Sequence, residues 1–293
     1  MKRSDSMDNH LLSVKNLCVS FPSPKGAVDA VRHVSFAMGR EKIGIVGESG
    51  SGKSVTGRAV LRLLPPYARV TAGHIIYQGR DLQSLSEKEM RGIRGRGISM
   101  VMQDPKYSLN PVRTVGRQIR EAYEINHTVS RHEARRQALE MLEAVRIRNP
   151  EQVYHLYPHE VSGGMGQRIM IAMMLVPKPG LLIADEPTSA LDVTVQLQVL
   201  AILDDLVSQR GMGLIFISHD LELVSSFCDR IIIMYGGRIM EVVAADRLHE
   251  SSHPYTRGLL NCLPKIDGDR KPLPTLQRDD AWLEQPENQE EVI

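Results

Sequence analysis

The sequence predicts an α/β fold with a core of parallel β-strands, and two observations indicate it. Short apolar runs alternate with helical segments along most of the chain, the pattern of a layered domain with a parallel sheet. A glycine-rich loop at residues 47–54 follows the apolar run 43–46 directly, and a helix is expected after it. This order of strand, glycine loop and Lys-Ser is the arrangement that holds a nucleoside triphosphate.

The first hundred residues are expected to be mainly strands. Residues 12–19 and 28–38 have strand patterns around a turn at 22–26, and strand 42–46 leads into the glycine loop. Helix 55–64 should follow the loop and end at Pro65 and Pro66, because proline cannot continue a helix. Residues 74–77 and 98–102 read as further strands.

From about residue 105 to 159 the pattern becomes helical. Ser130 and Glu133 have the spacing of a capping box. One face of the helix after them is apolar and comprises Ala134, Ala138, Met141, Leu142 and Val145. This stretch is therefore expected to be a helical insertion at one side of the sheet.

The second half of the chain returns to alternating strands and helices. Runs 181–184 and 214–217 are almost entirely apolar, which is typical of strands buried on both faces. Helix 194–207 lies between them, with a stripe of Val195, Val199, Leu203 and Leu206. Strands 231–235 and 238–243 should form a hairpin closed by Gly236-Gly237. Beyond Pro264 the chain becomes proline-rich and then acidic, which predicts a weakly ordered tail.

Composition limits the classes of protein that fit. With 293 residues and 42% hydrophobic content, the chain can bury a sizeable core and is expected to be a soluble globular protein. Its net charge of +1 gives no general attraction to nucleic acid or anionic lipid. The cysteines Cys18, Cys228 and Cys262 are far apart, which indicates a reducing compartment. No apolar stretch approaches the length of a membrane span, and the N-terminus lacks the apolar core of a signal peptide.

The glycine loop supplies the chemistry of a phosphate site. Its glycines let backbone N–H groups turn inward, where a Cβ would obstruct the phosphates. Lys53 is expected to place a cation on the β- and γ-phosphates, and the Ser54 hydroxyl to ligate Mg²⁺. The expected nucleotide contacts are Gly47, Glu48, Ser49, Gly50, Ser51, Gly52, Lys53, Ser54 and Val55. The alternative, a chance match in a glycine-rich turn, is disfavoured by the strand before the loop and the helix after it.

A second set of candidate residues ends the apolar run 181–184. In a phosphate-loop protein, an acid at the carboxyl end of such a strand faces Mg²⁺, and Asp185 fits that role through a water. Glu186 is then placed to polarise, as a general base, the water that attacks the γ-phosphate. A solvated strand end is the alternative for any Asp-Glu pair, and the phosphate loop upstream favours the functional interpretation.

Several ordered motifs resemble those of the ATP-binding-cassette (ABC) ATPases. Residues 161–168 resemble the family's signature sequence, Gln103 its Q-loop glutamine, residues 189–192 its D-loop and His219 its switch histidine. The motifs stand in the family's order and cover roughly residues 12 to 250. The resemblance implies a phosphate-loop NTPase fold with an antiparallel β subdomain, and an α-helical subdomain inserted at about 106–165.

The resemblance also implies roles for individual residues. In the family, the signature of one subunit closes over ATP held by a second subunit. The residues that would contact ATP in this way are Ser162, Gly163, Gly164 and Gln167. Asp192 would lie at the dimer seam, Gln103 would sense Mg²⁺ and the attacking water, and His219 would contact the γ-phosphate. Phe21 matches the aromatic residue that stacks on adenine. The structural alternative for Phe21 is ordinary packing at the end of a strand. For His219 it is a histidine that only occupies a turn.

Within the family, the chain resembles the ATPase subunits of bacterial oligopeptide, dipeptide and nickel importers. The shared segments are Val55-Thr56, Gln103-Asp104-Pro105, Ser108-Leu109-Asn110-Pro111, His253-Pro254-Tyr255-Thr256 and Gly258-Leu259-Leu260. This implies an ABC ATPase domain at 10–250 and a C-terminal extension at 251–293. Many such ATPases carry a cysteine cluster for an iron–sulfur centre in the extension. Only Cys262 is present here, so no cluster is expected.

The resemblance implies an importer subunit that uses ATP and Mg²⁺, in which ATP-driven dimer closure is coupled to uptake of a peptide, nickel or a similar small solute. The implied partners are a second ABC ATPase, identical or homologous, two membrane permeases and an extracytoplasmic solute-binding protein, with no nucleic acid. The chain would lie peripherally on the cytoplasmic face of the inner membrane. Two alternatives are a cytosolic ABC ATPase acting on nucleic acid or ribosomes and a catalytically silent regulatory subunit. A single cassette with no basic patch disfavours the first, and Glu186 and His219 argue against the second.

Overall fold

The structure is a computed structural model that describes residues 10–24, 26–103, 108–189, 191–263, 276 and 278–283. The chain forms two compact units. The first combines Met1–Leu85 with Phe216–Ile293, and the second is Ser86–Ile215. Most of the tail expected after residue 264, and Asp104, Pro105 and Ala190 of the family motifs, lie outside the described residues.

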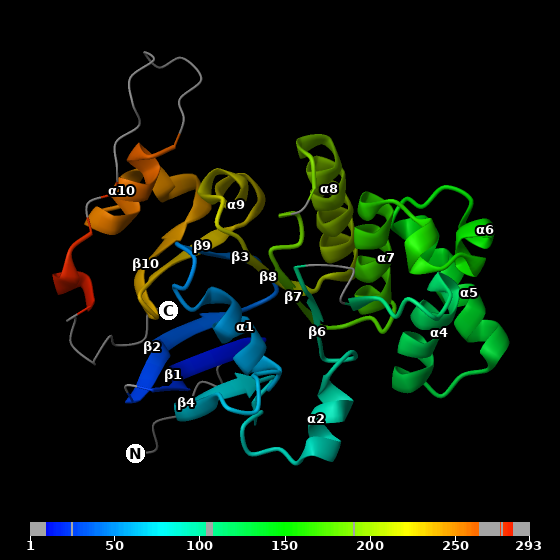
Figure 1. The fold of residues 1–293 in the computed structure, drawn as a ribbon, viewed down its shortest axis with the longest axis horizontal. Coiled ribbons are helices and arrows are strands. Elements are labelled where there is room, and N and C mark those ends of the chain that lie inside the picture. The colour runs from blue at the N-terminus through cyan, green and yellow to red at the C-terminus, as the bar shows by residue number, and fades with distance from the viewer. Residues whose placement is uncertain are drawn as a thin grey trace, which may run out of the picture. The chain divides into compact units, whose positions relative to one another are not determined.

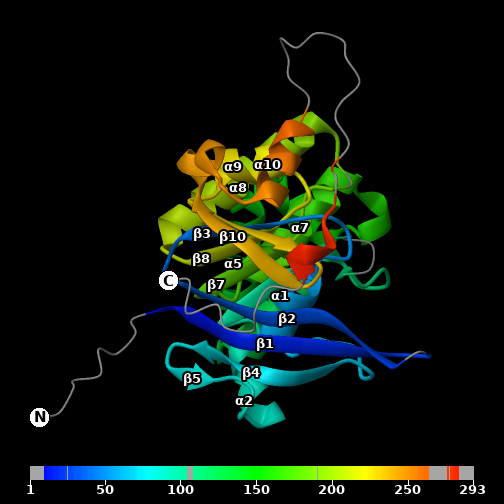
Figure 2. The ribbon, with the colours of Figure 1, turned by 90° about the vertical axis from the view of Figure 1, so that its left-hand side faces the viewer.

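The first unit contains a four-stranded antiparallel sheet in the order β2-β1-β4-β5, with strands side by side in Figure 2. Its strands are β1 (Leu12–Ser23), β2 (Gly26–Met38), β4 (Arg69–Tyr77) and β5 (Arg80–Asp81). The prediction that β1 ends before Pro22 is wrong, because the β1–β2 pairing continues to the pair Ser23↔Gly26. A proline is tolerated there because β1 pairs with β4 only as far as Ser20, so Pro22 has a neighbouring strand on one side alone.

The first unit also contains parallel strands that carry the glycine loop. Strand β3 (Lys42–Val46) pairs in parallel with β9 (Arg230–Tyr235), which forms an antiparallel hairpin with β10 (Arg238–Ala244). The predicted Gly-Gly turn is confirmed: Gly236 and Gly237 have φ values of 54° and 85°. Positive φ at both central residues gives a turn that matches the twist of the strands.

The helices of the first unit are α1 (Lys53–Val60), α9 (Leu221–Phe227) and α10 (Pro254–Asn261), with 3-10 turns at Ala245–Glu250 and Asp280–Leu283. The prediction that α1 ends at the two prolines is wrong. The helix stops at Val60, because Arg62 adopts a φ of 52° and the Leu63 N–H donates to the Arg58 oxygen at 2.9 Å. Helices α9 and α10 were not predicted, since each is too short to show helical periodicity.

The second unit contains two buried strands that pair in parallel, β6 (Ile98–Val101) and β7 (Leu181–Asp185), and several helices. Among its described residues the helices are α2 (Glu87–Ile93), α4 (Val115–Asn126), α5 (Arg131–Ala144), α6 (Pro150–His155), α7 (Gly163–Leu175) and α8 (Val193–Arg210), and a 3-10 turn lies at Pro158–Glu160. Helices α4 to α7 gather in one group (Figure 1). Strand β8 (Gly213–Ile217) carries the chain back to the first unit. The predicted α/β class with parallel strands, an antiparallel sheet and a helical segment is confirmed.

Helix α5 shows how local sequence sets these elements. The Ser130 hydroxyl accepts a hydrogen bond from the Glu133 N–H at 3.2 Å and so caps the helix. The Glu133 carboxylate pairs with Arg136 instead of returning to Ser130, so only half of the predicted capping box forms. The predicted apolar face is confirmed, because Ala134, Ala138, Met141, Leu142 and Val145 are all buried.

Candidate functional site

The glycine loop connects β3 to α1 in the first unit, and its backbone requires glycine. Gly47, Gly50 and Gly52 have φ values of 150°, 83° and 97°, which L side chains rarely adopt. A Cβ on Gly47 would lie 2.0 Å from the Met234 oxygen, and one on Gly52 would lie 2.5 Å from the Ala30 oxygen. The loop is therefore packed against neighbouring backbone, and only glycine fits these two positions.

The Lys53 side chain folds back over this loop. Its Nζ donates to the Gly47 oxygen and the Glu48 oxygen, each at 2.8 Å, and the residue is 5% exposed. The N-cap of α1 is Gly52, which has no side chain to accept a hydrogen bond from the first turn. A buried ammonium group at an N-terminus of this kind is a suitable site for an anion.

The remainder of the loop is fixed by the hairpin of β9 and β10. The Gly237 N–H donates to the Ser51 oxygen at 3.1 Å, and the Arg32 N–H donates to the Gly237 oxygen at 2.7 Å. Within the loop, the Ser51 N–H donates to the Glu48 oxygen at 3.1 Å. Segments far apart in the sequence thus hold the loop in one conformation, which lowers the entropy cost of binding a ligand.

Two further candidate residues belong to the first unit. His219 is exposed and lies two residues after the end of β8, and the next residue, Asp220, caps α9 by accepting from the Leu223 N–H at 2.9 Å. Phe21 is half-buried on β1, and its ring makes an edge contact with Tyr67, with ring centroids 6.1 Å apart. The histidine therefore stands at the carboxyl end of a buried strand, where ligands of parallel sheets bind.

The acidic pair ends β7 in the second unit. Asp185 is 2% exposed, and Glu186 follows it with a φ of 47°. A non-glycine residue in this left-handed region is uncommon, and such strained positions cluster at functional sites. The conformation turns the chain sharply at the end of the strand, and the turn is closed by the Ser189 N–H and hydroxyl, which donate to the Glu186 oxygen at 3.3 and 3.2 Å.

Gln103 and Glu186 are brought together although they lie far apart in the sequence. The Gln103 Nε2 donates to the Glu186 Oε2 at 3.1 Å. An amide that donates to the carboxylate fixes the direction of one oxygen, as an orienting group for a general base would. The contact joins two of the predicted catalytic residues directly.

The signature residues open helix α7. Ser162 is its N-cap and accepts from the Met165 N–H at 3.3 Å, while Gly163 is exposed. Gly164 lets α7 approach α8, since a Cβ there would lie 2.8 Å from the Val195 side chain. Gln167 is 2% exposed and donates to the Pro187 oxygen, which ties α7 to the turn after Glu186.

Asp192 of the predicted dimer seam is exposed and caps α8 by accepting from the Val195 N–H at 3.0 Å. The predicted residues thus divide between the units. Phe21, the glycine loop and His219 belong to the first, and Gln103, Asp185, Glu186, Asp192 and the signature belong to the second.

Two contacts to the glycine loop were missed by sequence reasoning. Tyr255 and Arg278 both bind Glu48 from the C-terminal extension. The segment His253-Pro254-Tyr255-Thr256 resembles a segment of the importer ATPases, but nothing in the sequence links it to the loop, because more than 200 residues lie between them. In the part of the chain that the structure describes, every helix is too short or too polar to cross a membrane.

Comparisons with known proteins agree with the motifs. The family model for the ABC transporter matches residues 31–189. The chain is 51% identical over 257 residues to the probable peptide ABC transporter ATP-binding protein y4tR of Sinorhizobium fredii, covering 87% of this chain and 77% of that protein. It is 48% identical over 260 residues to the dipeptide transport ATP-binding protein DppD of Bacillus subtilis, covering 88% of this chain and 78% of that protein.

Among solved structures, the dimeric post-hydrolysis state of the ATP-binding cassette MJ0796 bound to ADP and Pi matches with a TM-score of 0.72 and 25% identity. The match covers 80% of this chain and 98% of that one. The cytosolic alternative that acts on nucleic acid is not favoured by any of these relatives. The chain therefore belongs to the ABC transporter family, as an ATP-binding subunit that hydrolyses ATP to drive transport.

Proposed function

We propose that the chain powers a peptide importer and that the residues of the two units have the roles assigned to them from the sequence. The names of relatives that are 47% to 51% identical to this chain over the aligned residues support the peptide substrate class. The contact between the Gln103 amide and the Glu186 carboxylate carries the catalytic part of the proposal, because it orients the group expected to act as general base.

In this proposal the glycine loop and Lys53 bind the β- and γ-phosphates of ATP. The Glu186 carboxylate accepts a proton from the attacking water, Gln103 holds that carboxylate in place, and His219 contacts the γ-phosphate. The positive φ of Glu186 and its hydrogen bond to Gln103 support this assignment, since both restrict the direction of the carboxylate. Phe21 stacks on the adenine ring.

Mg²⁺ would be held by Ser54, Asp185 and Gln103. These residues offer a hydroxyl, a carboxylate and an amide oxygen, the hard oxygen donors that this ion prefers, and the 2% exposure of Asp185 suits a group that pairs with a cation. When bound, the ion would neutralise charge on the phosphate oxygens. Deprotonation of the water is left to the protein's own Glu186.

The variant Glu186→Gln tests the catalytic assignment. It should retain ATP binding, lose hydrolysis and accumulate as a closed dimer on ATP, because the amide keeps the size of the side chain but cannot accept the proton. Glu143→Gln, at an exposed position of α5, is a matched control that should hydrolyse ATP at the parental rate. Hydrolysis by Glu186→Gln at the parental rate would show that another residue is the base.

The variant Lys53→Ala tests the phosphate site separately. It should fail to bind ATP, as measured by titration with a fluorescent nucleotide, because the loop loses its buried cation. Parental affinity in Lys53→Ala would contradict the location of the site.

We further propose that the chain acts on the cytoplasmic face of the membrane with a second ABC ATPase, two permeases and an extracytoplasmic solute-binding protein. In this arrangement Ser162, Gly163 and Gly164 of one ATPase contact ATP in the other, and Asp192 lies at their seam. Gentle detergent extraction of the tagged chain, followed by mass spectrometry, should recover two multi-span proteins and another cassette. Recovery of ribosomal proteins alone would refute the proposed assembly with membrane permeases. Uptake of a labelled dipeptide, lost in cells that carry Glu186→Gln, tests the substrate class.

A further inference from the structure

The side of the glycine loop that faces the C-terminal extension makes two contacts through a single residue, Glu48. The hydroxyl of Tyr255, on α10, accepts a hydrogen bond from the Glu48 N–H at 3.2 Å. Arg278 forms an ion pair with the Glu48 carboxylate, with Nη2 and Oε1 3.2 Å apart. Backbone and side chain of one loop residue are thus both held by the extension, whose helix α10 and segment 278–283 are drawn in orange and red in Figure 1.

Glu48 connects these contacts to the phosphate-binding lysine. The Glu48 carbonyl accepts from the Lys53 Nζ at 2.8 Å, and the N–H of the same residue donates to Tyr255. The path from the extension to the ammonium group therefore contains only one loop residue. A shift of the Glu48 backbone would move one of the two carbonyls that position Lys53.

The tyrosine is held firmly by its surroundings. Tyr255 is fully buried, with its ring centroid 4.8 Å from that of Tyr235 and 5.7 Å from that of Trp282. Trp282 also contacts Tyr235 edge-on, and Tyr235 directly precedes the Gly236-Gly237 turn that binds Ser51 of the loop. Burial raises the pKa of Tyr255 to about 12, so the hydroxyl stays neutral at physiological pH. The aromatic cluster is therefore a rigid support for the loop.

The ion pair has an electrostatic consequence for phosphate binding. A carboxylate at position 48 places a negative charge in the loop that is expected to bind a triphosphate, and like charges repel. Arg278 compensates this charge. Because the Arg278 side chain is 64% exposed and that of Glu48 is 31% exposed, water screens the interaction and its effect should be modest.

We propose that Tyr255 and Arg278 are positioning residues for the phosphate loop, so that the C-terminal extension sets the affinity of the loop for nucleotide. The proposal rests on the assignment of residues 47–54 as the nucleotide site. It predicts that substitutions in the extension alter the affinity for nucleotide although the substituted residues do not contact the nucleotide. The alternative is that the aromatic cluster serves only the stability of the extension.

The experiment uses the full-length chain and gives two quantities for each variant. The dissociation constant for a fluorescent ATP analogue is measured well below the melting temperature, and the melting temperature itself is measured separately. Tyr255→Phe removes only the hydroxyl and should weaken binding about threefold to tenfold, the effect of one lost hydrogen bond. Arg278→Met should weaken binding about twofold to fivefold, whereas Arg278→Lys, which keeps the charge, should bind almost as the parent does. Arg257→Met, at an exposed position of α10, is the matched control and should leave affinity unchanged.

A double-mutant cycle separates the electrostatic role from a structural one. In a Glu48→Gln background there is no loop carboxylate to compensate, so Arg278→Met should no longer change the affinity. Lower melting temperatures with parental dissociation constants for Tyr255→Phe and Arg278→Met would overturn the proposal in favour of the structural alternative. Parental affinity in Lys53→Ala would instead refute the nucleotide site itself, so the two failures are distinguishable.

Discussion

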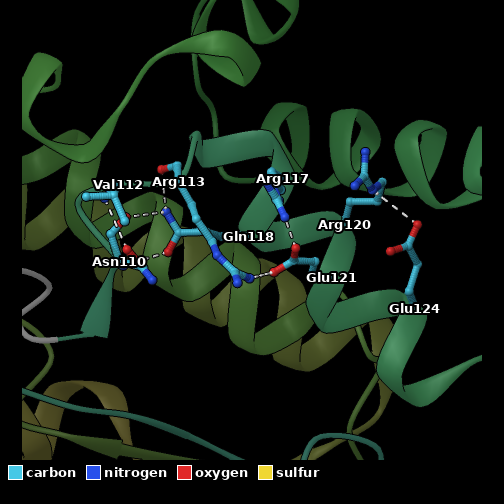
Figure 3. A network of polar contacts seen from close by, with 8 residues as sticks. All are labelled: Asn110, Val112, Arg113, Arg117, Gln118, Arg120, Glu121 and Glu124. Carbon is cyan, nitrogen blue, oxygen red and sulfur yellow. Dashed lines mark hydrogen bonds and ion pairs between the residues drawn. The ribbon is translucent and has the colours of Figure 1, made fainter.

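Replacement of Gln118 by Met tests whether a single buried amide holds the loop at residues 110–113. Gln118 lies on α4, is 7% exposed, and makes three hydrogen bonds to the loop backbone (Figure 3). Its Oε1 accepts from the Asn110 N–H at 2.7 Å, and its Nε2 donates to the Asn110 and Arg113 oxygens at 3.1 and 3.0 Å. Met has a similar length and a high helix propensity, so the change removes the polar atoms and little else.

The expected effect follows from these contacts. A typical hydrogen bond contributes about 1 kcal/mol net, and a buried group left without a partner costs about 1–3 kcal/mol. Asn110 is exposed, so water can replace some of the hydrogen bonds that its backbone loses when the Gln118 amide is removed. We therefore expect local opening of the loop to become easier by about 1–3 kcal/mol, which corresponds to roughly 5- to 150-fold faster exchange of the Asn110 amide hydrogen.

Hydrogen exchange measured by mass spectrometry on a peptide covering residues 108–114 gives the readout, because opening of this loop need not involve global unfolding. The matched control is Arg117→Met on the same helix. It removes the Arg117–Glu121 ion pair at 2.9 Å, in which the arginine is 55% exposed, and should change exchange by about fivefold at most. Equal exchange rates in Gln118→Met and the parent would refute the argument that Gln118 fixes the loop.

Three further predictions follow from packing and protonation. Gly47→Ala should abolish nucleotide binding in a fluorescence titration, because its Cβ would lie 2.0 Å from a main-chain oxygen of β9, whereas Gly39→Ala, with nothing within 4 Å, should bind normally. Gly116→Ala should lower the urea-derived stability by about 1–3 kcal/mol, since its Cβ would meet an aromatic ring of α6 at 2.1 Å, while Gly92→Ala should not destabilise. Burial lowers the pKa of His253 below 6.5, against an opposing effect of the Glu241 charge. The unfolded chain therefore binds the proton more tightly, and stability should fall as pH drops below 6.5. The free energy of unfolding of His253→Asn, measured with urea, should therefore fall less between pH 7.5 and pH 5.5 than that of the parent. An equal fall in both proteins would show that His253 is not the group responsible.

The local parts of the site could be predicted from the sequence because they depend on residues close together in the chain. The glycines of the loop, the lysine after them and the acids at the end of an apolar strand are each positioned by their immediate neighbours. Positive φ at Gly47, Gly50 and Gly52 is a property of this local chain, and so is the Gly236-Gly237 turn.

Other features could not be predicted, for physical reasons that differ from case to case. The end of α1 is set by the backbone of Arg62 and not by the prolines. Helices α9 and α10 have seven and eight residues, which is too short for helical periodicity to separate them from loops. Strand β1 extends through Pro22 because β1 pairs with β2 at that position, whereas its pairing with β4 ends at Ser20.

The sequence by itself determined the family, the phosphate loop and the candidate base, since these are recorded in consecutive residues and in the order of motifs. Only the tertiary structure decided which distant groups meet. It brought the Gln103 amide within 3.1 Å of Glu186, placed Gln167 against Pro187, and set Tyr255 and Arg278 on Glu48. Such contacts join residues separated by 20 to 230 positions. They depend on how strands and helices pack, and local propensity carries no record of that packing.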